Sequence, residues 1–97
     1  MTTPKYMIAH GSAAVQAARI IAAVAKDRED KARGYDLAAQ WHDKQAASCR
    51  EIANDAPRID ATTRAKAAVA AIHHGASAAG LRNAASDLLR KAIAEAA

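Results

Sequence analysis

Apolar residues recur at spacings of three and four positions along almost the whole chain. In the first part of the sequence, Ala14, Ala17, Ile21 and Val24 follow this spacing, and Ile20 lies beside them. Such a stripe is typical of one face of an amphipathic helix. Thr3 and Pro4 are suited to the N-cap and the first position of this helix. The alternative is an interruption at Gly11, after which Ser12 caps the helix afresh.

A second helix is predicted from about Tyr35 to Asn54. Its apolar stripe consists of Leu37, Trp41, Ser48 and Ile52. We interpret this stripe as part of the domain's own core, which places the indole inside. Proline at position 57 cannot continue the helical hydrogen bonds, so residues 54–58 form the clearest break in the chain.

The last forty residues favour two further helices. Asp60 is a suitable N-cap for a helix that continues through Ile72. Gly75 can close this helix, and a fourth helix then covers 77–93. The alternative is one long helix that includes Gly75 and Gly80, each of which costs about 1 kcal/mol relative to alanine.

Residues 26–36 differ from the rest, since eight of these eleven residues are charged. Oppositely charged residues lie four positions apart, which supports a helix but builds no core. A segment that is polar on all sides is expected to project into solvent or to turn the chain. Gly34 is the predicted corner.

These elements predict an all-α fold: a small three- or four-helix bundle in one domain. It consists of two antiparallel helical hairpins, residues 12–54 and 59–97, joined at the break 54–58. Alanine fills 30 of the 97 positions, and only three residues are aromatic. Alanine is the strongest helix former and lets helices approach closely, but it leaves a thin core.

The charge and the single cysteine give weaker indications. The formal net charge is +4, a mild preference for anionic partners. Cys49 excludes an internal disulfide and suits a reducing compartment. The longest largely apolar stretch, residues 17–25, contains Arg19 and is too short to span a bilayer. We therefore expect a cytoplasmic protein without a membrane partner.

The sequence contains no pattern typical of catalysis, of cofactor binding or of a metal site. A metal site across helices would need His42, Asp43 and one of His73 or His74, and we take these as ordinary helix residues instead. Cys49 lies two helical turns from His42, too far for a direct nucleophile–base pair. We expect a protein that is not an enzyme and has no cofactor.

The leading hypothesis is a non-enzymatic binding module, an adaptor or inhibitor that docks on a larger protein or ribonucleoprotein assembly. The small size and lack of chemistry would also suit a phage or mobile-element accessory protein that blocks a host machine. The charged segment and the adjacent aromatic residue supply the expected contacts, namely Arg28, Lys31, Arg33, Tyr35 and His42.

Two alternatives remain open. The first is nucleic-acid binding by the more basic C-terminal half, with contacts from Arg58, Arg64, Lys66, Arg82, Arg90 and Lys91. The second is a homodimer whose alanine faces pair across a two-fold axis.

Overall fold

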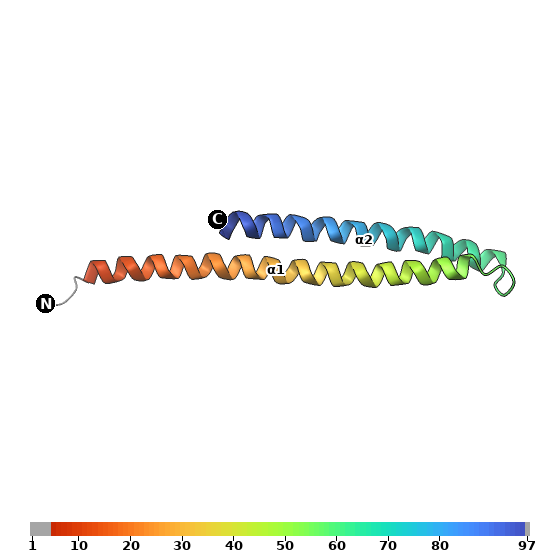
Figure 1. Ribbon diagram of the computed structural model, residues 1–97, viewed down its shortest axis with the longest axis horizontal. Coiled ribbons are helices and arrows are strands. Elements are labelled where there is room, and N and C mark those ends of the chain that lie inside the picture. The colour runs from red at the N-terminus through yellow and green to blue at the C-terminus, as the bar shows by residue number, and fades with distance from the viewer. Residues whose placement is uncertain (1–4, 97) are drawn as a thin grey trace.

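The protein consists of two long antiparallel helices. The computed structural model describes the backbone of residues 5–96 and the side chains of residues 12–95. Helix α1 spans Lys5–Ala53 and helix α2 spans Ala61–Ala96. The predicted helix start at Thr3 and Pro4 lies outside the described residues, and α1 passes Gly11 without an interruption. They form one extended hairpin of 88 × 17 × 14 Å (Figure 1). The all-α prediction is confirmed, whereas the predicted three- or four-helix bundle is wrong.

The two helices contact each other through alanine. The buried side chains of the described residues are all alanine, and most repeat every seventh position: Ala25, Ala32, Ala39 and Ala46 in α1, and Ala71, Ala78, Ala85 and Ala92 in α2, with Ala67 in addition. A seven-residue repeat keeps one seam facing the partner helix, as in a coiled coil. A methyl group at each repeat allows the two backbones to lie close together.

Larger residues occupy the second inward position of each seven-residue repeat, but they are only partly covered. In α1 these include Arg28, His42 and Cys49, and in α2 they include His74, Leu81, Leu88 and Glu95. No large side chain among the described residues is fully buried. A hairpin two helices thick has no interior that could enclose one.

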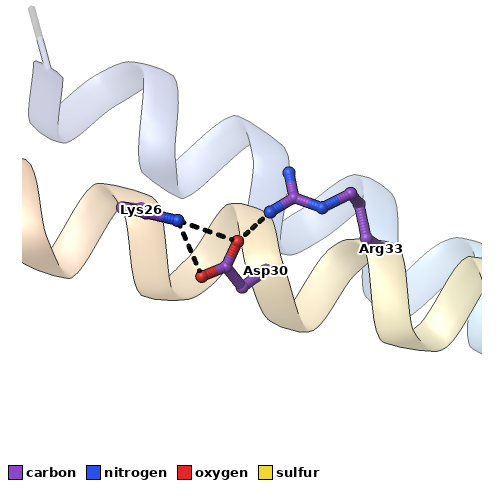
Figure 2. Close-up of polar contacts among 3 residues, drawn as sticks. All are labelled: Lys26, Asp30 and Arg33. Carbon is purple, nitrogen blue, oxygen red and sulfur yellow. Dashed lines mark hydrogen bonds and ion pairs between the residues drawn. The ribbon is translucent and has the colours of Figure 1, made fainter.

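The predicted corner at Gly34 is wrong, because α1 continues through the charged segment without a break. Ion pairs run along the helix surface: Lys26 Nζ lies 3.1 Å from Asp30 Oδ2, and Arg33 also contacts Asp30 (Figure 2). Lys31 Nζ lies 3.0 Å from Asp27 Oδ2. Because these charged side chains pair with one another along α1, the segment continues as helix and does not turn the chain.

The predicted break at Gly75 is also wrong. Helix α2 includes both Gly75 and Gly80, and a Cβ atom at either position would meet open space. The cost of a helical glycine, about 1 kcal/mol, is smaller than the loss of the contacts that the helix makes on both sides of it. The two predicted C-terminal helices are therefore one.

The chain reverses direction in residues 54–60. The amide of Ile59 donates to the carbonyl of Asp55 at 2.9 Å, and Arg58 Nε lies 3.1 Å from Asp55 Oδ2. Asp60 then caps α2, since its Oδ1 accepts a hydrogen bond from the Thr63 amide at 2.8 Å. This bond lowers the pKa of the Asp60 carboxyl below its ordinary value of 3.8. The cap fixes where α2 begins.

The alanine seam makes a prediction about residue size. Ala78 is 1% exposed, whereas Ala76 is exposed on the same helix. We expect Ala78→Leu to lower the free energy of unfolding by about 1–3 kcal/mol, because the helices must move apart to admit the larger side chain. Ala76→Leu should leave it unchanged within about 0.5 kcal/mol. Urea unfolding at equal protein concentration measures both, and equal effects would contradict the seam.

The Asp60 cap makes a prediction about pH. A carboxyl whose pKa is lower in the folded state stabilises the fold above its unfolded pKa, and this contribution is lost as the pH falls through the folded value. Asparagine caps a helix about as well as aspartate but does not titrate. The difference in melting temperature between the wild type and Asp60→Asn should therefore shift in favour of the variant as the pH falls from 5 to below 3.8. If the difference in melting temperature stays constant over this pH range, the Asp60 carboxylate does not stabilise the fold through its lowered pKa.

Candidate docking surface

Large hydrophobic side chains lie on the outside of the hairpin. Twelve of them are between 37% and 70% exposed: Val15, Ile20, Ile21, Val24, Tyr35, Leu37, Trp41, Ile52, Val69, Ile72, Leu89 and Ile93. Scattered exposed hydrophobic residues are normal, but a continuous exposed patch indicates an interaction surface. The outer surface of this hairpin is thus the place to search for a binding site.

The stripe of Leu37, Trp41, Ser48 and Ile52, here called the Trp41 face, is exposed rather than buried. The prediction that this stripe belongs to the core is therefore wrong. The alanines of the seven-residue repeat occupy the core positions. Trp41 follows Ala39 of this repeat by two residues, so it does not lie on the inward side of α1. The spacing of seven between alanines was the sequence pattern that could have placed these side chains on the surface.

An aromatic cluster joins the Trp41 face to α2. The ring centroids of Trp41 and His42 lie 4.9 Å apart, and those of Trp41 and His74 lie 5.7 Å apart, both pairs in edge-to-face geometry. Nδ1 of His42 and Nδ1 of His74 are 2.8 Å apart, so one ring donates a hydrogen bond to the other. The two imidazoles thus link the helices and hold the indole from one side.

Trp41 combines exposure with a fixed position. It is 53% exposed, yet two imidazole rings lie against it in edge-to-face geometry. A half-exposed tryptophan that is already ordered loses little conformational freedom when a partner covers it. Tryptophan is also enriched among the residues that dominate binding energy at protein interfaces. These properties make Trp41 the natural centre of a docking surface.

The three basic residues predicted to bind a partner are paired within the chain. Arg28 forms an ion pair with Glu95 of α2, which links the two helices. Lys31 pairs with Asp27, and Arg33 pairs with Asp30. Both of these pairs lie within α1. Arg28 therefore contributes to the fold, while Lys31 and Arg33 remain exposed at the surface.

Tyr35 and His42 have different surroundings. Both occupy inward positions of the seven-residue repeat in α1. The Tyr35 side chain is nevertheless exposed, and His42 is partly buried against His74. The structure brings His42 beside Trp41 in the aromatic cluster, whereas Tyr35 lies almost two turns earlier on α1.

Most of the basic residues proposed for nucleic-acid contact also have acidic or carbonyl partners. Arg58 pairs with Asp55, Arg90 with Asp87, and Arg64 Nε donates to the carbonyl of Ile59 at 3.0 Å. Arg82 of α2 bonds Asp43 of α1, which lowers the pKa of the Asp43 carboxyl and raises that of the guanidinium. Lys66 and Lys91 are exposed, and no ion pair is seen for either among the described residues.

Residues that could support metal or nucleophilic chemistry are dispersed. Within the part of the chain whose side chains are described, no three His, Cys, Asp or Glu residues gather closely enough to hold a metal ion. His42 does meet His74, but Asp43 turns to Arg82 and His73 is exposed. Cys49 is a free, partly covered thiol.

Comparison with known proteins adds no relative. No protein-family model matches the chain, and neither a curated protein nor a solved structure was found that matches it. Neither helix, over the residues described, has a segment long and apolar enough to cross a membrane.

The histidine pair makes a testable prediction. His74→Ala removes the partner of the partly buried His42 ring, so we expect the free energy of unfolding to fall by about 1 kcal/mol. His73→Ala, at the exposed neighbouring position, is the matched control and should stay within about 0.5 kcal/mol of the wild type. Denaturant unfolding followed by helical circular dichroism gives both values. If the two variants behave alike, the histidine contact does not stabilise the hairpin.

Proposed function

We propose that this protein is a non-enzymatic binding module that docks on a larger protein or ribonucleoprotein assembly through the Trp41 face of α1. The observation that carries the proposal is the half-exposed indole of Trp41, held against His42 and His74. An adaptor or an inhibitor would act through such a surface without any chemistry of its own.

The shape of the Trp41 face suits a helical partner. Leu37 and Trp41 lie one helical turn apart, and Ile52 lies three turns beyond Trp41 on the same side. Side chains at this spacing on a helix are typical anchors for a second helix or for an apolar groove.

The charges of the chain argue against nucleic acid as the main partner. Binding to phosphates needs free basic side chains, and each one engaged steepens the dependence of affinity on salt. Four of the six proposed contact residues already have partners within the hairpin, and two lysines remain. Two lysines at opposite ends of α2 form a weak phosphate-binding surface.

Affinity capture from the native lysate with three immobilised proteins tests the proposal. The wild type should retain a stoichiometric protein partner in the presence of nuclease. Trp41→Ala should weaken its binding at least about 30-fold, the effect of losing a dominant interface residue. Ile93→Ala, which alters a side chain 70% exposed on α2, should bind as the wild type does.

Titration of the captured partner against the purified variants supplies the affinities. If Trp41→Ala and Ile93→Ala lose affinity equally, the Trp41 face is not the docking surface. Loss of the partner after nuclease treatment, together with an affinity that falls steeply with salt, would favour the nucleic-acid alternative instead.

A further inference from the structure

Helix α1 is longer than its partner and runs past the end of α2. The cross-helix pair of Arg28 with Glu95 marks the last turn of α2, and Ala25 is the first buried residue of α1 among those whose side chains are described. Figure 1 shows the N-terminal part of α1 continuing alone beyond this point. We call residues 5–24 the α1 extension, whose side chains are described from residue 12 onward.

The seam that binds α2 continues into the α1 extension. Ala18 lies seven positions before Ala25, at the place in the repeat that alanine holds throughout α1. Ile21 takes the place that Arg28 holds one repeat later. The same interface is therefore present on the extension, and no helix among the described residues covers it.

The α1 extension is also more apolar than the rest of α1. Val15, Ile20, Ile21 and Val24 are all exposed there. Arg19 is the single charged residue between positions 12 and 25, and it lies seven positions before Lys26, whose side chain is 72% exposed. The one charge thus projects from the outward side and leaves the seam uncharged.

We infer that the α1 extension binds the α1 extension of a second copy of this chain, in antiparallel orientation. A seam of small residues admits close approach only from a helix that is equally small at the facing positions, and an identical extension meets this requirement. Because the two extensions have the same length, each covers the other completely. Two uncharged seams meet without repulsion, in contrast to the charged segment that follows.

The end of α2 favours the same arrangement. A helix antiparallel to the extension has the direction of α2, so the N-terminus of the second copy's α1 meets the C-terminus of α2. This contact joins the positive end of one helix dipole to the negative end of another.

Light scattering and small-angle X-ray scattering on the purified full-length protein test the inference. Light scattering should give twice the chain mass of 10.1 kDa. Two hairpins of 88 Å that overlap by the twenty-residue extension, about 30 Å at 1.5 Å per residue, give a rod of about 145 Å. A monomer, or a side-by-side dimer that stays near 88 Å long, would overturn the inference without any variant being needed.

Two variants locate the interface. The double variant Ile21→Asp/Val24→Asp places charges on the extension, at side chains that are 48% and 39% exposed, and should be a monomer with unchanged helical circular dichroism. The double variant Val69→Asp/Ile72→Asp introduces the same two charges, also three positions apart, at exposed positions in the first half of α2 and should remain a dimer. If Ile21→Asp/Val24→Asp keeps the dimeric mass and the length of the wild type, the proposed interface is contradicted. Neither result depends on the Trp41 face.

Discussion

The close contact of two helices through alanine is the constraint on which the rest of the structure depends. Ala32, Ala39 and Ala46 of α1 are at most 2% exposed, as are Ala78, Ala85 and Ala92 of α2. Since larger residues cannot replace these methyl groups without separating the helices, the large hydrophobic side chains must lie elsewhere. In a hairpin of only two helices, these side chains lie at the surface.

The charged residues follow from the same arrangement. Once the seam is apolar and narrow, ionic contacts can form only along each helix or across its margins. Arg28 with Glu95 and Asp43 with Arg82 bridge the helices at the margins, and Lys31 with Asp27 stays within α1. Exposed pairs of this kind add little stability, but they fix the relative alignment of α1 and α2 and neutralise much of the surface. The exposed hydrophobic side chains are therefore the most distinctive feature of the outer surface of the hairpin.

The sequence predicts helix over nearly the whole chain, because alanine dominates and no strand pattern competes, and the structure confirms the all-α class. The predicted bundle is wrong for a physical reason: alanines, and not the large aliphatic side chains, mark the core of this hairpin, and Trp41 therefore lies outside. Gly34 is no corner and Gly75 no break, because the packing along a long helix outweighs the cost of a single glycine. The contact of His42 with His74 depends on the antiparallel alignment of the two helices, which local sequence patterns do not specify.

Stability and association are coupled in such a molecule. A large side chain contributes about 1.5–3 kcal/mol when fully buried, whereas an alanine methyl contributes far less. Ordering the backbone costs about 1–2 kcal/mol per residue, so a hairpin whose buried side chains are alanine gains little margin from its own seam. Covering the Trp41 face or the α1 extension buries the residues that the hairpin leaves outside. Binding therefore adds to folding stability in proportion to the logarithm of partner concentration. Under the proposed docking, another chain would bury these exposed hydrophobic side chains, and that burial would add to the small contribution of the alanine seam.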